Sequence, residues 1–311
     1  MEPSFLGPLC ALGSSVAWAL GSSSYSKLSR TYSPFSINLA RASFALPLFI
    51  LMTFLVSGGL IEGLASYQRV TFVHWGWFSI SILGSYGLGD ILFYWSTRSM
   101  GVPGALAIAS CYPVWSFLAG VWIGREPIHS GQVFGLGFTL LGVVIVVLSG
   151  ASPENLGESL NDLERKKKKV PWTGLFLAVM ASIGWGANSF AVARVGEQLS
   201  PSVANTVRMT LAFIFCLGFG RLLVPKDPIF LSRRELFRYS WLFVIEAFLG
   251  SLLYVYGLAH SSFVVGPALA ALAPVISVPV AVLLKLEKFC ISRTLGVIFV
   301  VFGVSLLLEV F

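Results

Sequence analysis

One stretch of this chain occurs twice. Residues 33–41 (SPFSINLAR) return 167 positions later as residues 200–208 (SPSVANTVR), with Ser, Pro, Asn and Arg in the same places. Further along, the offset between matching residues becomes 161, a slip that one shorter loop in the second copy explains. The later matches are Gly89/Gly250, Pro113/Pro274, Glu126/Glu287, Gly135/Gly296 and Gly142/Gly303. An internal repeat of this length in a very apolar chain is typical of a membrane transporter.

The composition points to lipid as the main solvent. Hydrophobic residues make up 56% of the 311 residues, charged residues only 11%, and the mean hydropathy is +0.83. A soluble protein of this size needs about a quarter of its residues charged. The net charge of +7 does not indicate nucleic-acid binding, because the basic residues lie at the edges of apolar segments. The four cysteines occur singly, without metal or redox spacing, so we expect no metal and no cofactor.

Ten segments have the roughly 20 apolar residues that a membrane-spanning helix needs. We place the first repeat in residues 1–150, a charged linker at 151–171 and the second repeat at 172–311. Five helices fall in each repeat, and five is odd, so the second repeat must enter the membrane from the opposite face. The predicted fold is an all-α membrane protein with ten transmembrane helices in two inverted five-helix repeats. The segments are 5–26, 34–56, 74–97, 102–123, 130–149, 172–193, 201–223, 239–259, 263–284 and 290–310.

The loops between these segments carry an uneven distribution of Lys and Arg. Three basic residues lie on the side that holds the N-terminus and 16 on the other side. The positive-inside rule then predicts that both termini lie outside the cytoplasm. The linker ends in a basic run, residues 165–169, which we interpret as part of a solvated connection and topology anchor; the alternative is a patch that binds anionic lipid.

Several features together resemble the EamA family of the drug/metabolite transporter superfamily. The first helix of each repeat contains a Trp (Trp18 and Trp185), and the second helix of each repeat opens with Pro-x3-Asn-x2-Arg. The fourth helix of each repeat contains a Pro, and a Glu follows just after that helix. The Gly-rich fifth and tenth helices fit as well. The resemblance covers nearly the whole chain. It implies a ten-helix carrier of small metabolites, in many members an exporter, with a cavity between the halves. Members usually keep both termini in the cytoplasm, whereas the charge count favours the opposite orientation.

Two carboxylates lie at membrane depth. Asp90 is near the middle of the third predicted helix and Glu246 is in the equivalent helix of the second repeat. Ionisable groups at such depth cost roughly 2.5–3.5 kcal/mol on insertion, so they are functional candidates by default. Either residue could take up a coupling proton or hold a cationic group of a substrate. The alternative is a carboxylate that pairs with an arginine for a structural purpose.

Two Asn–Arg pairs lie inside the helices that open with the repeated motif. Asn38 and Arg41 are three residues apart and share a helix face, as do Asn205 and Arg208. The guanidinium groups could recognise an anionic substrate. Because the pair occurs in both repeats, and an asymmetric substrate rarely needs the same anchor twice, we expect a structural role for all four residues.

Aromatic and polar residues at mid-helix depth are candidates for the wall of a binding cavity, because a buried Trp or Tyr needs a partner for its polar tip. Prolines that interrupt a helix, and carboxylates at helix ends, are candidates for kinks or gates. The candidate substrate-binding residues are Trp18, Asp90, Tyr94, Trp95, Tyr112, Trp185, Asn188, Glu246, Tyr254 and Tyr256. The candidate kink or gate residues are Pro113, Pro274, Glu126 and Glu287.

The sequence therefore predicts a multi-pass secondary transporter, an exporter of a small metabolite such as an amino acid, that works by alternating access. Its expected partners are the substrate, the lipid bilayer and protons as a coupling ion, without nucleic acid, in a monomer or homodimer. A carrier of phosphorylated or nucleotide-linked sugars and a channel are alternatives. The chain has no GxxxxGK[ST] loop for ATP. Its three His lie near helix ends without HExxH or GxSxG patterns, so we do not expect an enzyme.

Overall fold

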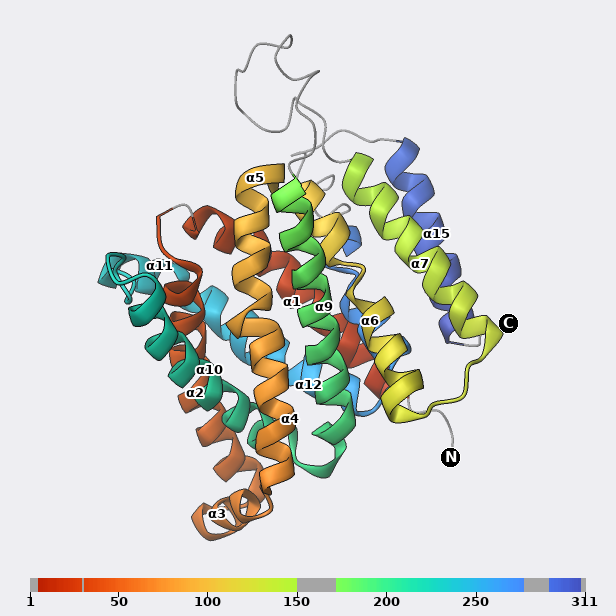
Figure 1. Ribbon diagram of the computed structural model, residues 1–311. Coiled ribbons are helices and arrows are strands. Elements are labelled where there is room, and N and C mark those ends of the chain that lie inside the picture. The colour runs from red at the N-terminus through yellow and green to blue at the C-terminus, as the bar shows by residue number, and fades with distance from the viewer. Residues whose placement is uncertain (1–4, 30, 150–171, 277–290, 309–311) are drawn as a thin grey trace.

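A computed structural model describes residues 5–29, 31–149, 172–276 and 291–308, and all regular structure in these ranges is helical. The predicted linker 151–171 lies outside the described residues. In the first repeat the elements are α1 (Leu6–Leu28), α2 (Pro34–Ser57), α3 (Leu60–Gln68), α4 (Phe72–Ile82), η1 (Leu83–Gly87), α5 (Gly89–Ala109), α6 (Tyr112–Ala119), η2 (Gly120–Gly124) and α7 (Ser130–Ser149). Figure 1 shows them as a bundle of long helices.

The second repeat follows the same order. Its elements are α9 (Trp172–Val195), η4 (Gly196–Gln198), α10 (Pro201–Leu223), α11 (Arg233–Leu242), η5 (Phe243–Gly250), α12 (Ser251–Ala259), α13 (Val265–Ala270) and α15 (Ile291–Leu307). The equivalent helices α4 and α11 begin at Phe72 and Arg233, which are 161 positions apart, as the later offset of the repeat requires. Each of these helices then passes into a π-helical segment, η1 or η5.

The packing of the helices follows a pseudo-two-fold axis. The equivalent helices α2 and α10 pack on each other, and so do α7 and α15. The contact of α1 with η5 and α12 is matched by the contact of α9 with η1 and α5. Likewise α13, which the offset of 161 makes equivalent to the last residues of α5, packs on α1 as α5 packs on α9. The first helix of each repeat therefore packs mainly against the other half.

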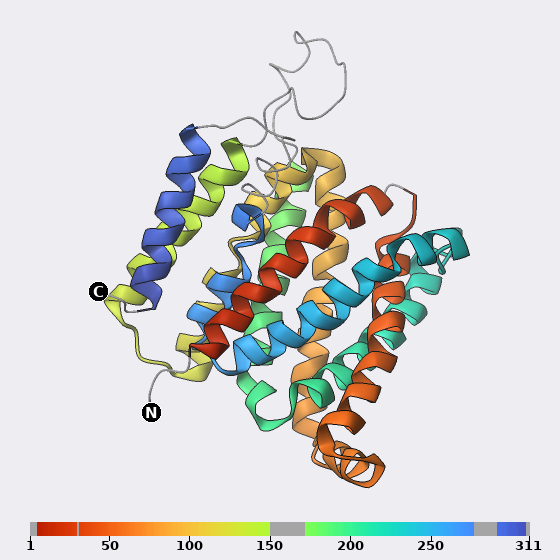
Figure 2. The same cartoon turned by 180° about the vertical axis from the view of Figure 1, so that it is seen from behind.

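Close glycine contacts show the relative direction of α7 and α15, which lie side by side in both views (Figures 1 and 2). A Cβ atom on Gly135 would come 2.8 Å from the carbonyl oxygen of Gly303. A Cβ atom on Gly142 would come 2.5 Å from the carbonyl oxygen of Gly296. The earlier glycine of α7 thus contacts the later glycine of α15, and the later glycine of α7 contacts the earlier glycine of α15. The two equivalent helices are therefore antiparallel, as an inverted repeat requires.

The fourth and ninth helices are interrupted at equivalent places. In the first repeat, α5 ends at Ala109 and α6 begins at Tyr112, with Pro113 in its first turn. In the second repeat, α13 ends at Ala270, and helix resumes at residue 273, just before Pro274. Proline lacks a backbone N–H and fits the first turn of a helix, where no intrahelical partner is needed.

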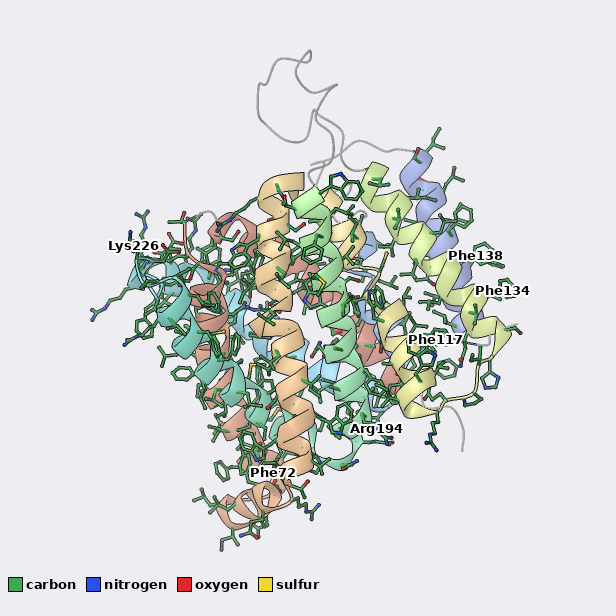
Figure 3. The ribbon with its side chains drawn as sticks, viewed as in Figure 1. Phe72, Phe117, Phe134, Phe138, Arg194 and Lys226 are labelled. Atoms are coloured by element: carbon green, nitrogen blue, oxygen red, sulfur yellow. The ribbon has the colours of Figure 1, made fainter. Side chains whose placement is uncertain are left out.

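The outer surface is apolar, as expected for a protein embedded in lipid. Phe72 on α4 and Phe134 on α7 lie at the periphery (Figure 3) and expose 92% and 64% of their surface. Within the described ranges, five helices are long and apolar enough to cross a membrane, and four shorter apolar helices accompany them. Figure 3 also shows Arg194 and Lys226 on different sides of the molecule. Arg194 is one of the three basic residues counted on the side of the N-terminus, and Lys226 is one of the 16 counted on the other side.

One predicted connection is partly helical. The stretch 57–73 contains α3, which packs on α2 through the contact of Phe54 with Gly63. Leu60, Ile61 and Leu64 of this short helix are exposed. At nine residues it is too short to cross a bilayer, so a search for spans of about 20 residues overlooks it. The stretch predicted as a loop at 224–238 likewise contains the start of α11.

Candidate functional site

A cavity of about 120 Å³ lies between the two repeats. Both halves contribute to its wall, and the wall combines aromatic rings, hydroxyl groups and charged side chains. The lining residues are Ser14, Trp18, Arg41, Ser85, Tyr86, Asp90, Ser110, Tyr112, Trp185, Asn188, Arg208, Glu246, Gly250, Ser251, Tyr254, Ala270, Ala271, Ala273 and Pro274.

The repeated sequence motif sets the position of the two arginines. Ser33 caps α2 by accepting a hydrogen bond from the backbone N–H of Ser36, and Pro34 occupies the first turn. Ser200 and Pro201 do the same for α10. Serine caps and first-turn prolines both define where a helix begins. The arginine two turns later is therefore held at a fixed depth in each half.

Arg41 is the centre of a buried ion cluster. Its guanidinium donates to Glu246 through Nε (3.0 Å) and Nη2 (2.6 Å), and to Asp90 Oδ2 through Nη1 (2.7 Å). Nη1 also donates to Asn38 Oδ1 at 2.8 Å. The two carboxylates come from different repeats, so this cluster ties the halves together. A fork that binds one carboxylate with two N–H groups is the strongest arrangement available to arginine.

Neighbouring aromatic residues complete the cluster. The Tyr25 hydroxyl donates to Glu246 Oε2 at 2.9 Å, and the Trp185 indole N–H donates to Asp90 Oδ1 at 3.0 Å. The guanidinium of Arg41 lies 4.2 Å from the ring centroid of Tyr86 and 5.0 Å from that of Tyr25. Each carboxylate is therefore hydrogen-bonded as well as paired, which is what a buried charge requires.

Arg208 has different neighbours. Its Nε donates to Ser81 Oγ at 3.0 Å, Nη1 to Asn205 Oδ1 at 2.9 Å and Nη2 to Asn188 Oδ1 at 3.2 Å. Its guanidinium carbon lies 5.8 Å from the ring centroid of Tyr254. All of these partners are neutral.

The cavity brings together seven of the ten residues predicted to bind substrate. They are Trp18, Asp90, Tyr112, Trp185, Asn188, Glu246 and Tyr254. The other three lie outside its lining. Tyr94 is buried beside Phe93, Trp95 is 37% exposed, and Tyr256 stacks on His260 with 4.2 Å between ring centroids. Because neighbouring positions on a helix point in different directions, equal depth in the membrane does not mean that two residues face the same cavity.

The candidate kink and gate residues are distributed along the chain. Pro274 lines the cavity, and Pro113 is buried next to the lining residue Tyr112. Glu126 is in the connection after η2 and is half-buried, and burial raises the pKa of its carboxyl, with the backbone N–H of Phe263 acting in the opposite direction. Glu287 lies outside the described residues.

Sequence reasoning overlooked the serines and tyrosines that complete the site. Ser85, Ser251 and Tyr86 line the cavity, and Tyr25 supports Glu246. The internal repeat could have identified Ser85 and Ser251. Applying the offset of 161 to Asp90 gives Ser251, and applying it to Glu246 in reverse gives Ser85. Nothing in the sequence pattern marked Tyr25 or Tyr86.

Comparisons with known proteins agree with this architecture. The model of the EamA-like transporter family matches residues 5–148 and 172–309. A protein of Archaeoglobus fulgidus described as an uncharacterized transporter is 23% identical over 303 residues, covering 96% of this chain and 97% of its own. One solved crystal structure has the same fold, with a TM-score of 0.72 at 16% identity, covering 100% of this chain and 97% of that one. The chain is a multi-pass membrane transporter and belongs to the EamA-like transporter family.

Proposed function

We propose that this protein is a secondary transporter that exports a small metabolite, such as an amino acid, by alternating access between its two inverted repeats. The observation that carries the proposal is the cavity at the seam, which both repeats line. Where two equivalent halves meet around one site, each half can take the conformation of the other, and the site then opens to the opposite face.

The wall of the cavity suits a small solute with an apolar body and polar ends. Trp18, Tyr112, Trp185 and Tyr254 supply ring surface, and hydroxyl and charged groups lie between the rings. Binding sites for small molecules commonly combine apolar walls with a few placed polar groups. An amino acid has this composition. Export, rather than uptake, is proposed on the resemblance to the family alone.

The ion cluster supports proton coupling. Asp90 and Glu246 share the single guanidinium of Arg41, so one negative charge is in excess when both carboxylates are ionised. Two carboxylates that share a site disfavour the state in which both are charged. Uptake of one proton removes the excess charge and weakens one of the links between the halves, which couples protonation to their relative movement.

The test is transport by the purified protein in proteoliposomes, with and without a pH gradient. The panel contains amino acids, other small metabolites and a sugar phosphate. Each compound is supplied inside the vesicles in one assay and outside them in another. We expect saturable, pH-dependent flux of an amino acid or another small metabolite. If no compound of the panel crosses the membrane, the proposed function is wrong. A flux that does not saturate with the concentration of the compound indicates a channel.

The coupling role is tested with Asp90→Asn and Glu246→Gln, and Glu62→Gln on the exposed face of α3 serves as the matched control. We expect both cavity variants to lose the response to the pH gradient, while Glu62→Gln keeps it. If both cavity variants transport at the full rate with the same pH dependence as the wild type, the carboxylates do not couple protons.

A further inference from the structure

The two repeats differ at the positions that neutralise their arginines. Arg41 and Arg208 are equivalent, 167 positions apart, and both are only 2% exposed and line the cavity. Around Arg41 the counter-charges are Asp90 and Glu246. Their equivalents by the offset of 161 are Ser251 and Ser85, and both serines line the cavity as well. The counterpart of the Arg41 cluster therefore keeps the cation, Arg208, but has a neutral serine from each repeat in place of the two anions.

Arg208 forms no ion pair within the described part of the chain. No carboxylate oxygen of those residues lies within 4.0 Å of its guanidinium, whereas Arg41 has two carboxylates at ion-pair distance. A buried charge without a counter-ion is costly, and hydrogen bonds to neutral groups compensate only in part. A protein that keeps such a charge in a cavity gains if a ligand supplies the missing anion.

Arg208 also has N–H donors that the hydrogen bonds described above do not use. A guanidinium carries five N–H donors. The bonds to Ser81, Asn205 and Asn188 use three of them, which leaves two N–H groups. At Arg41, four of the donor positions are taken by Glu246, Asp90 and Asn38. Only the arginine of the second repeat can hold an oxyanion with a fork of N–H groups.

We propose that Arg208 binds an anionic group of the transported solute, a carboxylate or a phosphate, while Arg41 serves as a structural tie that takes no part in anion binding. This inference rests on the proposed function, because it names the substrate class of the same cavity. Asn188 and Tyr254 orient the site: the Asn188 amide accepts from Arg208 and donates to the Tyr254 hydroxyl at 2.7 Å. The sequence motif is the same around the two arginines, and the structure gives them different surroundings.

The first test compares the stability of the ligand-free protein in detergent. Arg208→Gln removes a charge that has no counter-ion, so we expect its unfolding temperature to equal or exceed that of the wild type. Arg41→Gln leaves two carboxylates unpaired, so we expect its unfolding temperature to fall by several degrees. A fall for Arg208→Gln as large as that for Arg41→Gln would assign Arg208 a structural role and overturn the proposal.

The second test measures ligand binding through the fluorescence of Trp18 and Trp185, both in the cavity wall. The probes are pairs that differ only in the anionic group: L-leucine and L-leucinamide, 3-methylbutyrate and 3-methylbutyramide, glycerol 3-phosphate and glycerol. The first two pairs report carboxylate recognition and the third reports phosphate recognition. We expect the wild type to prefer the anionic member of at least one pair by about 10- to 100-fold, the effect of a hydrogen bond to a charged group.

Three variants complete the experiment. In Arg208→Gln we expect the anionic preference to disappear, and in Arg208→Lys, which keeps the charge without the fork, we expect it to be partly retained. Arg194→Gln, on an exposed arginine, is the matched control and keeps the wild-type preference. If Arg208→Gln keeps the full preference, or if the wild type shows none in any pair, the inference fails. Binding without any transport in proteoliposomes would instead refute the proposed function and leave the Arg208 site standing.

Discussion

At the scale of single residues, the contrast between Arg41 and Arg208 is the main result. A symmetric sequence motif places both side chains, but only Arg41 has carboxylates around it. The sequence identified both arginines, both carboxylates and most of the aromatic wall. It could not show that the two carboxylates from different repeats converge on one guanidinium, because that contact depends on how the halves pack.

The geometry of the cluster predicts an order of stability for its variants. Glu246 accepts two hydrogen bonds from Arg41 and one from Tyr25, whereas Asp90 accepts one from Arg41 and one from Trp185. We expect Glu246→Gln to destabilise the protein more than Asp90→Asn, with a loss of up to about 3–5 kcal/mol for the broken buried pair. Thermal unfolding in detergent measures the order. A larger loss for Asp90→Asn would contradict the described geometry.

A second residue-scale prediction concerns Glu126, in the connection beyond η2. Burial raises the pKa of this carboxyl, so the folded protein favours its protonated form. The wild type therefore loses a small stabilising contribution as the pH rises through that pKa. Glu126→Gln does not titrate, so we expect its unfolding temperature to increase relative to the wild type between about pH 4 and about pH 7. A difference that stays constant or changes in the opposite direction would show that burial does not control this group.

At the scale of helices, the apolar composition and the length of segments in the sequence predicted nearly every span. The exceptions have physical causes. The nine-residue α3 is shorter than any membrane span, and the π-helical segments η1 and η5 have no signature in hydropathy. The prediction of an interrupted fourth helix needed only Pro113, because proline cannot continue a helix from the preceding turn.

The contact between α7 and α15 gives a prediction at this scale. Gly142 faces the backbone of Gly296, whereas a Cβ atom on Gly137 of the same helix would meet nothing within 4 Å. We expect Gly142→Ala to force the helices apart and to cost about 1–3 kcal/mol of unfolding free energy. Gly137→Ala should leave the stability unchanged or raise it slightly, because alanine favours helix. Equal effects of the two substitutions on the unfolding temperature would contradict this packing.

At the scale of the whole molecule, the repeat in the sequence was sufficient to predict the arrangement of the halves. An odd number of spans per copy requires inversion, and the antiparallel contact of α7 with α15 shows it. The cavity follows from the same symmetry, since α1 and α9 each pack against the opposite half. Its charge distribution does not follow, because substitutions of Asp and Glu by Ser break the symmetry at single positions.

The most direct test of the account is counterflow in proteoliposomes. Vesicles are loaded with a high concentration of the unlabelled solute that binds best, and entry of the labelled solute from a dilute outer medium is followed with time. A carrier whose one central site faces each side in turn predicts a transient accumulation of label above equilibrium, which is abolished when the inner solute is omitted. A simple rise to equilibrium that does not depend on the inner solute would contradict alternating access.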